Sequence, residues 1–111
     1  MIIAIEGDGS FQMALPEMAT IKQWNLPVKI IVLNNGKLGM VRELQKNCYK
    51  SNYFAVSLDG SPDFVKLAQA YDIKSARISC DEELENAFKT MLADDEAYLL
   101  EIDVYSEENT L

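Results

Sequence analysis

Residues 1–10 read MIIAIEGDGS and residues 28–36 read VKIIVLNNG, and these two stretches decide the fold. In each, a short apolar run rich in β-branched residues ends at glycine or asparagine, which is typical of a buried strand. Residues 10–33 lie between the two clusters and leave room for one crossover helix. The pattern therefore predicts two neighbouring parallel strands. Asp8 and Asn35 would then lie at the same carboxyl edge of the sheet, where open α/β folds bind their ligands.

Helical and extended patterns alternate along the rest of the chain. Pro16 is compatible with the first helix only in its first turn, because a proline inside a helix removes a hydrogen bond and clashes with the preceding turn. In the last strand, apolar residues alternate with Glu101 and Asp103, so we expect one face to meet solvent, as in an edge strand. The pattern predicts a three-layer α/β fold with a mostly parallel sheet and flanking helices. The expected helices are 12–24, 38–47, one with Pro62 at its first position and one capped by Asp81, and the expected strands are 1–5, 28–33, 73–79 and 98–105.

The length and composition are those of one small domain, which we expect to span residues 1–111. A hydrophobic content of 49% and a charged content of 25% are ordinary for a soluble globular protein. No apolar run approaches the ~20 residues of a membrane span, and the N-terminus lacks the basic leader of a signal peptide. Cys48 and Cys80 lie far apart in a chain without histidine, which favours free thiols over a zinc site or a disulfide. We therefore expect a cytoplasmic protein with no membrane partner.

The net charge of −8 is unevenly distributed. Residues 1–58 carry six Lys/Arg against four Asp/Glu, whereas residues 59–111 carry four against fourteen. We interpret the acidic clusters at 81–85 and 94–96 as solvated helix ends. No basic patch with interleaved aromatic residues is present, which argues against a nucleic-acid partner. The two strand-end clusters thus lie in the half of the chain that does not repel a polyanion.

The predicted elements are too few for an independently folded domain of this class, and the first strand begins at the first residue. Met1 falls directly inside a strand, with no element before it. A parallel sheet needs helices over both faces, and the expected helices are few for that purpose. We expect the chain to be a piece of a larger polypeptide. We also expect its uncovered apolar faces to self-associate, giving a homo-oligomer.

The strand-end clusters carry the oxygen ligands that Mg²⁺ prefers. Asp8 offers an anionic oxygen, the side chain of one of the two asparagines a neutral one, and a backbone carbonyl in the Gly36-Lys37 turn a third. Neighbouring strands lie about 4.8 Å apart, so these oxygens can reach one cation. Gly7 and Gly9 let the main chain approach a ligand closely, and amides at Gly9 and Ser10 begin a helix, whose N-terminus favours an anion. Together they indicate a magnesium–diphosphate site.

Neither cluster is specific by itself. Gly-Asp-Gly is usually a turn, and Asn-Asn-Gly is a common loop signal. Their joint placement, each at the end of a strand and one crossover apart, favours the metal–diphosphate interpretation. The chain contains neither the Gly-x-Gly-x-x-Gly fingerprint of dinucleotide-binding folds nor a Walker-type Gly-Lys-Ser/Thr.

At these positions the sequence resembles a known family. The pair Gly7-Asp8-Gly9 and Asn34-Asn35, about two dozen residues apart, resembles the thiamine diphosphate signature. The amino-acid sequence around these motifs is similar to that of the C-terminal cofactor-binding domain of acetolactate (acetohydroxyacid) synthase large subunits. The segments that carry this likeness are GDGSFQM at 7–13, NLPVKI at 25–30, LNNG-x-LGMVR at 33–42, PDFVKLA at 62–68 and Glu107-Glu108-Asn109.

The resemblance implies a role for individual residues and an activity. Asp8 and Asn35 would bind Mg²⁺ together with the main-chain carbonyl of Lys37. In such enzymes thiamine diphosphate decarboxylates pyruvate, and the remaining two-carbon unit is added to a second 2-oxo acid. The fold would be a truncated thiamine diphosphate-binding fold. The residues expected to hold the diphosphate are Gly7, Gly9 and Ser10, and those expected to run along the cofactor are Leu38, Gly39 and Met40.

Parts of the family's machinery lie outside this sequence. The glutamate that activates the cofactor belongs to an N-terminal pyrimidine-binding domain, normally of a partner subunit, and the residue that bends the cofactor lies upstream. We therefore expect no catalytic side chain in this chain and no activity from it alone. The parent enzyme can carry FAD in a middle domain. Leu44 stands where many relatives have tryptophan near the substrate entrance.

Two other functions stay open at this point. Another thiamine diphosphate enzyme, such as a glyoxylate carboligase, a sulfoacetaldehyde acetyltransferase or a pyruvate oxidase, would share these motifs. A non-catalytic binding or assembly module could also retain the fold. Glu6, next to the first cluster, is interpreted as structural.

Overall fold

The structure, a computed structural model, describes residues 1–105 of the 111-residue chain. Its centre is a parallel sheet with the strand order β1-β2-β4-β3. The strands are β1 (Ile2–Gly7), β2 (Val28–Asn34), β3 (Lys74–Ile78) and β4 (Tyr98–Asp103). All three pairings are parallel, so the carboxyl ends of the strands meet at one edge of the sheet. Asp8 and the turn after Asn34 both lie at that edge.

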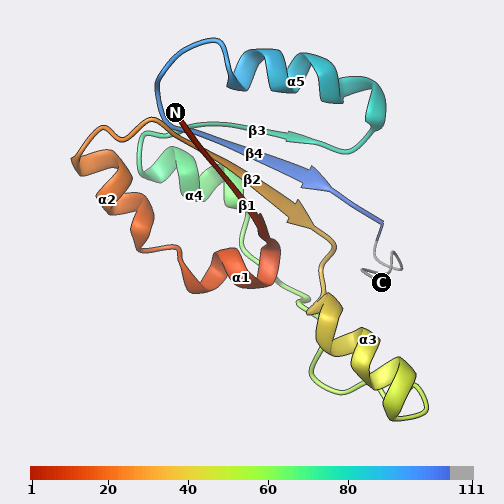
Figure 1. Cartoon of the computed structure of the whole chain (residues 1–111). Coiled ribbons are helices and arrows are strands. Elements are labelled where there is room, and N and C mark those ends of the chain that lie inside the picture. The colour runs from red at the N-terminus through yellow and green to blue at the C-terminus, as the bar shows by residue number, and fades with distance from the viewer. Residues whose placement is uncertain (106–111) are drawn as a thin grey trace.

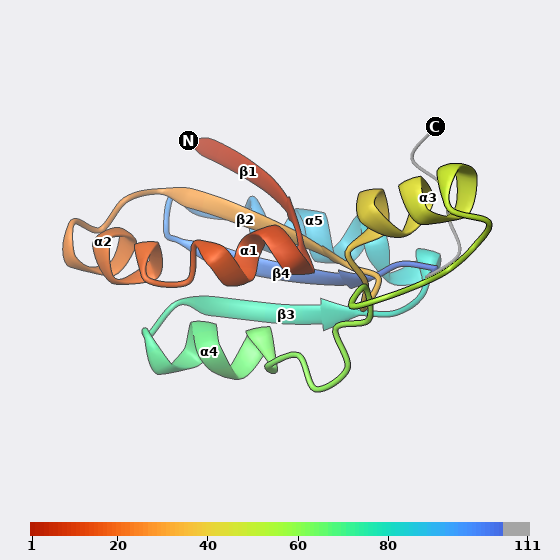
Figure 2. The ribbon, with the colours of Figure 1, turned by 90° about the horizontal axis from the view of Figure 1, so that it is seen from below.

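Helices cover both faces of the sheet, as Figures 1 and 2 show. Three helices pack on one face: α1 (Asp8–Met13), α2 (Glu17–Gln23) and α4 (Phe64–Ala70). On the other face lies α5 (Leu84–Met91), which follows the 3₁₀ turn η1 (Asp81–Glu83). The remaining helix, α3 (Gly39–Cys48), extends from the carboxyl end of β2 away from the sheet and buries none of its residues (Figure 2).

The core divides into two clusters, one on each face of the sheet. Phe64 of α4 is fully buried in the first, where its ring meets that of Phe11 edge-on at 5.5 Å between centroids. Burial of aromatic rings of this size dominates the energetics of a small core. The first cluster comprises Phe11, Met18, Ile21, Ile30, Val32, Phe64, Ala68, Ile73 and Leu99, and the second Ile31, Ile78, Met91, Tyr98 and Leu100.

The parallel pairing of the first two strands is confirmed. Ile5 pairs with Ile31 and Gly7 with Leu33, so the two strands end side by side. The helix expected at 38–47 is α3, within one residue at each end. The prediction of a layered α/β fold with a parallel sheet is therefore correct.

The single helix expected over 12–24 is wrong. The chain instead forms α1 from Asp8 and α2 from Glu17, with a turn between them. Pro16 caps α2 rather than lying inside a longer helix, because its ring and missing amide exclude the interior. The side chain of Met13, at the end of α1, is exposed.

Two further helix starts are corrected. The helix expected to have Pro62 at its first position begins at Phe64, where the Asp63 carboxylate accepts a hydrogen bond from the Lys66 amide at 3.0 Å. An aspartate cap satisfies a free amide of the first turn, which a proline cannot do. Asp81 opens a 3₁₀ turn rather than α5 itself.

The last strand is not an edge strand. β4 lies between β2 and β3, and its Glu101 is only 1% exposed despite its charge. The edge positions belong to β1 and β3, and Ile2, Ile3 and Ile5 of β1 are exposed instead of buried. The alternation of acidic and apolar residues in β4 thus reflects a buried polar contact, described below, and not a solvent-facing surface.

Two simpler expectations concern cysteines and membranes. Cys48 and Cys80 are both free and exposed. In residues 1–105, no helix has the length and apolar character needed to cross a membrane. The segment Glu107-Glu108-Asn109, quoted above for its resemblance, lies outside the described residues.

Candidate functional site

Asp8 lies where β1 ends and α1 begins, and its side chain is 1% exposed. The backbone amides of Asn35 and Gly36, from the turn after the neighbouring strand, face its carboxyl group and act to lower its pKa. The structure therefore brings Asp8 and the Asn34-Asn35-Gly36 turn together, as the sequence predicts.

Within this chain, the surroundings of Asp8 disfavour the charged form of its carboxyl group. Desolvation by burial raises the pKa of its carboxyl, and this outweighs the amides of Asp8, Gly9, Asn35 and Gly36, which lower it. Its Oδ2 atom is buried and has no hydrogen-bond partner among residues 1–105. A buried carboxylate oxygen without a partner costs stability, and a bound cation would offset that cost. The site fits a metal ion.

Asparagine side chains shape the turn that faces Asp8. Gly36 has φ of +66°, a left-handed conformation that favours glycine. Asn34 Oδ1 accepts a hydrogen bond from the Gly36 amide at 3.0 Å, and Asn35 Oδ1 accepts one from the Lys37 amide at 3.0 Å. An amide oxygen has two lone pairs, so the Asn35 oxygen keeps the capacity for a second partner.

The carbonyl of Lys37 lies on the same side of the chain as Asn35. Lys37 forms an antiparallel bridge with Ser57, and the flanking bonds join Leu38 to Val56 and Leu58 to Gly36. Lys37 and Ser57 are therefore a non-hydrogen-bonded antiparallel pair, in which the amide and the carbonyl of each residue point away from the other residue. Because the Lys37 amide donates to Asn35 Oδ1, its carbonyl also points toward the Asn35 side.

Two glycines allow close packing around the turn. A Cβ atom on Gly9 would lie 2.7 Å from Leu38 Cδ2 and 3.4 Å from Leu58 Cδ1, so Leu38 packs directly over Gly9. A Cβ on Gly39 would lie 3.2 Å from Asn35 Nδ2. Leu38 thus contacts Gly9, and Gly39 lies against the Asn35 side chain, whereas Met40 is 78% exposed.

Ser10 and Gly7 form a local network with Glu6. The Ser10 hydroxyl donates to Glu6 Oε2 at 2.7 Å and accepts from the Gly7 amide at 3.1 Å. This contact gives Glu6 a structural partner. The Ser10 hydroxyl is engaged within the chain and would have to rotate to donate to a ligand.

Residues 1–102 match the sequence profile of the family described as "Thiamine pyrophosphate enzyme, C-terminal TPP binding domain". The chain belongs to this family. It is 40% identical over 108 residues to the acetolactate synthase isozyme 2 large subunit of Escherichia coli, covering 97% of this chain and 20% of that protein. It is 42% identical over 100 residues to a probable acetolactate synthase large subunit of Methanococcus aeolicus, covering 90% of this chain and 17% of that protein.

Solved structures of thiamine diphosphate enzymes share the fold. A Rhodococcus jostii thiamine diphosphate-dependent 4-hydroxybenzoylformate decarboxylase superposes with a TM-score of 0.87 at 32% identity, covering 96% of this chain and 20% of that one. Benzoylformate decarboxylase from Polynucleobacter necessarius gives a TM-score of 0.88 at 25% identity, over 98% of this chain and 20% of that one. The chain thus spans about a fifth of the length of the relatives it matches.

One residue of this thiamine pyrophosphate domain was missed as part of the site. Glu101 Oε1 accepts a hydrogen bond from Asn34 Nδ2 at 2.7 Å, although the two residues come from different strands. A glutamate within the otherwise apolar run of β4 is a sequence signal for such a contact. The alternation with Asp103, which suggested a solvent-facing strand, concealed it.

The ligand set expected here differs from a cluster of acidic side chains. Within residues 1–105, no three histidine, cysteine, aspartate or glutamate side chains gather in a way that could hold a metal ion. A set made of one carboxylate, one amide oxygen and one main-chain carbonyl requires no such cluster, since Mg²⁺ completes its shell with phosphate oxygens and water.

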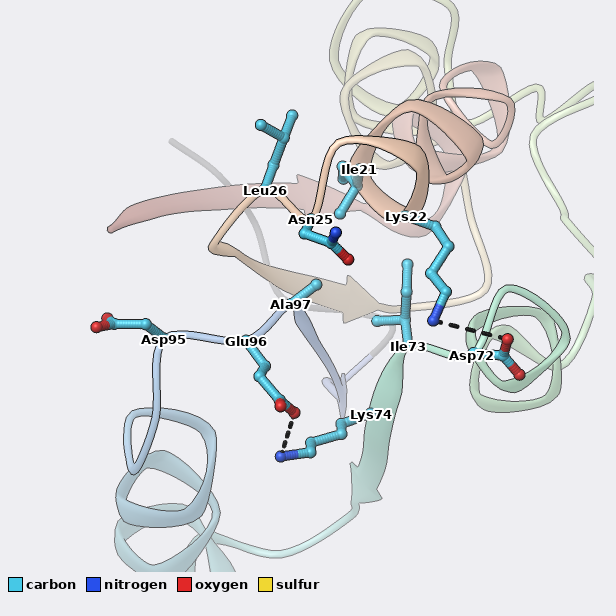
Figure 3. Close-up of a pocket in the computed structure, with 10 residues that line it drawn as sticks. All are labelled: Ile21, Lys22, Asn25, Leu26, Asp72, Ile73, Lys74, Asp95, Glu96 and Ala97. Atoms are coloured by element: carbon cyan, nitrogen blue, oxygen red, sulfur yellow. Dashed lines mark ion pairs between the residues drawn. The ribbon is translucent and has the colours of Figure 1, made fainter.

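A cavity lies at the opposite edge of the sheet (Figure 3). Its volume is about 360 Å³, and the connections that precede β2, β3 and β4 line it. Four of the five charged side chains that line it form ion pairs: Lys22 with Asp72 at 3.6 Å and Lys74 with Glu96 at 2.5 Å. Because it lies at the amino ends of the strands, this cavity is separate from the site at Asp8.

The acidic cluster at 94–96 beside this cavity is not simply solvated. Asp94 accepts from Lys74 at 2.6 Å, and the fully buried Lys29 of β2 donates to it at 3.4 Å. The hydrogen bond from Lys74 is the main cause that lowers the pKa of Asp94 to about 2. Asp94 therefore ties the loop before β4 to two strands.

Proposed function

We propose that this chain is the Mg²⁺–thiamine diphosphate-binding portion of an acetolactate synthase-like transferase. Such an enzyme decarboxylates pyruvate and joins the remaining two-carbon unit to a second 2-oxo acid. The observation that carries the proposal is the buried, unpartnered Oδ2 of Asp8 beside the Asn34-Asn35-Gly36 turn. The 40% identity to an acetolactate synthase large subunit supports this choice of enzyme.

In the proposed metal site, three oxygens of the chain bind Mg²⁺: a carboxylate oxygen of Asp8, Oδ1 of Asn35 and the main-chain carbonyl of Lys37. Asp8 supplies the negative charge, and its burial prevents water from competing for that oxygen. The turn amides that face Asp8 favour its charged form and hold it in place. Phosphate oxygens and water would complete the octahedral shell.

In the proposed cofactor site, the main chain does most of the binding. Gly7 and Gly9 allow close approach to the diphosphate, and Ser10 offers a hydroxyl once it releases Glu6. The residues proposed to run along the cofactor are Leu38, Gly39 and Met40. Met40 has most of its surface free for such a contact. When bound, thiamine diphosphate supplies the nucleophilic carbon and the electron sink for decarboxylation of a 2-oxo acid.

The chain itself contributes binding and orientation, and we propose no catalytic side chain within it. The proton-transferring glutamate would come from the pyrimidine-binding domain of the parent or of a partner subunit. The chain alone would therefore be inactive on pyruvate. Cytoplasmic location, a homo-oligomeric parent and FAD in that parent belong to the same proposal.

A second candidate is a thiamine diphosphate enzyme of another specificity. The superposition on two decarboxylases, with TM-scores of 0.87 and 0.88, supports it, because the fold does not distinguish them from synthases. Sequence identity favours the synthase, at 40% against 32% and 25%. A non-catalytic binding module would share the fold as well.

Calorimetry with thiamine diphosphate, with and without Mg²⁺, tests the proposed site. We expect weak binding that requires Mg²⁺ and disappears in Asp8→Ala, with no turnover of pyruvate. Asp59→Ala, which alters an exposed aspartate, is the control and should bind like the wild type. Binding that survives Asp8→Ala would contradict the ligand assignment. Pyruvate turnover by this chain alone would contradict the assignment of the essential acid to another domain, and absence of any binding would favour the non-catalytic module.

A further inference from the structure

Glu101 carries a buried carboxylate on β4, a central strand of the sheet. It pairs with Val32 of β2 on one side and Arg77 of β3 on the other, and it is 1% exposed. Its Oε1 accepts from Asn34 at 2.7 Å and lies 3.9 Å from Arg77 Nε, while Oε2 has no hydrogen-bond partner among residues 1–105. A buried carboxylate is costly, and an apolar residue would fit a central strand better. The residue therefore calls for a reason beyond core packing.

The bond to Glu101 fixes the orientation of the Asn34 amide group. An ionised carboxylate only accepts hydrogen bonds, so Asn34 must present Nδ2 to it and Oδ1 to the other side. On that other side, Oδ1 accepts from the Gly36 amide at 3.0 Å. A flipped amide group would lose both bonds. Glu101 thus selects the one arrangement in which Asn34 holds the left-handed turn at Gly36.

The same turn carries the groups that meet Asp8. The amides of Asn35 and Gly36 face its carboxyl, and the Lys37 amide donates to Asn35 Oδ1. A path of direct contacts therefore leads from Glu101 through Asn34 and the turn to the buried carboxyl of Asp8. Asn34 itself is at the end of β2 and is not one of the expected metal ligands.

We propose that Glu101 is a positioning residue for the metal site, which it sets by orienting Asn34 and hence the Asn34-Asn35-Gly36 turn. This inference rests on the proposed function for its consequence, metal binding. Its structural part, control of the turn, can be measured without metal. The two parts can therefore fail separately.

Amide hydrogen exchange by NMR on the metal-free 111-residue chain is the first readout. In Glu101→Leu we expect the amides of Gly36 and Lys37 to exchange about 10-fold faster, the factor for loss of one hydrogen bond of ordinary strength. Glu101→Gln keeps an oxygen that can accept from Asn34 and should exchange like the wild type. If Glu101→Leu does not fold, Glu101→Met, which also lacks an acceptor for Asn34 Nδ2 and leaves Asn34 Oδ1 in place, must show the same local acceleration.

Val32→Ala is the matched control. Val32 is the neighbour of Glu101 on β2 and is fully buried, so its truncation loosens the same part of the sheet while the bond between Glu101 and Asn34 remains. Exchange at Gly36 and Lys37 relative to core amides should stay as in the wild type. The proposal is overturned if Glu101→Leu leaves the turn unchanged, if Val32→Ala accelerates it equally, or if Glu101→Gln fails to restore it.

The second readout is a chemical-shift titration with Mg²⁺ and thiamine diphosphate, analysed per folded molecule. We expect Glu101→Leu to weaken binding about 10-fold and Glu101→Gln by no more than about 3-fold. Equal affinity of wild type and Glu101→Leu would refute the functional part. If the wild type shows no response at all, the proposed metal site fails, and the exchange data still decide whether Glu101 controls the turn.

Discussion

Replacing Asp8 by asparagine should stabilise the chain while removing its metal site. The substitution keeps an oxygen for the amides of Asn35 and Gly36 and removes the buried charge. A buried polar atom without a partner costs about 1–3 kcal/mol, and more if it is charged. Since Asp8 Oδ2 is such an atom and the replacement amide is still unpartnered there, we expect the free energy of unfolding to rise by about 1 kcal/mol at neutral pH.

The pH dependence of this gain follows from the direction of the pKa shift. Burial raises the pKa of folded Asp8 above its usual 3.8, so between these two values the folded state holds a proton that the unfolded state has lost. Stability contributed by this group is therefore lost as the pH rises through that window. The advantage of Asp8→Asn should be largest above the raised pKa and shrink as the pH falls toward 3.8.

Urea denaturation followed by circular dichroism, with and without Mg²⁺ and thiamine diphosphate, measures both effects. The wild type should gain stability from the added ligands, whereas Asp8→Asn should gain none. Asp59→Asn, a change at an exposed aspartate, should leave the curves unchanged. A loss of stability in ligand-free Asp8→Asn, or a gain that does not decrease at lower pH, would refute this account of the buried carboxylate.

Three further predictions concern the rest of the chain. Phe64→Ala removes a fully buried ring that packs edge-on against Phe11, and it should lower the free energy of unfolding by about 3–5 kcal/mol in urea denaturation; a loss below ~1 kcal/mol would show that the core relaxes around it. The hydrogen bond from Lys74 lowers the pKa of Asp94 from 3.8 to about 2, so its stabilisation is present above pH 3.8 and is lost as the pH falls from 3.8 to about 2. Asp94→Asn should flatten this part of the stability profile, and an unchanged profile would contradict the assignment. Ile5 is 63% exposed on the edge strand β1, so the wild type should self-associate at high concentration. Ile5→Lys should sediment as a monomer. A monomeric wild type would contradict self-association through β1.

The sequence predicts that Asp8 meets the turn after β2, because the relevant constraints are local. Apolar runs that end at Gly7 and Asn34, together with one crossover between them, are enough to set two parallel strands side by side. The register between β1 and β2 then brings Asp8 next to the Asn34-Asn35-Gly36 turn. The fold class follows from the same alternation of strands and helices.

The wrong predictions, of one helix over 12–24 and of an edge position for β4, concern features that the local sequence pattern does not determine. The helical period of Ala14, Met18 and Ile21 runs through the turn before Pro16 without a break, so two short helices look like one. The alternation in β4 is that of an edge strand, but contacts with Asn34 of another strand bury Glu101. Sequence patterns report how polar a residue is, and they do not report which distant residue satisfies it.

Paramagnetic broadening by Mn²⁺, a substitute for Mg²⁺, tests the central claim most directly. In the presence of thiamine diphosphate, the NMR amide signals of Gly9 and Lys37 should broaden together over one range of Mn²⁺ concentration, because a single ion lies between the two strand ends. In Asp8→Ala, neither signal should broaden over that range. Broadening that is confined to the acidic residues 94–96, or that persists unchanged in Asp8→Ala, would contradict a shared metal site.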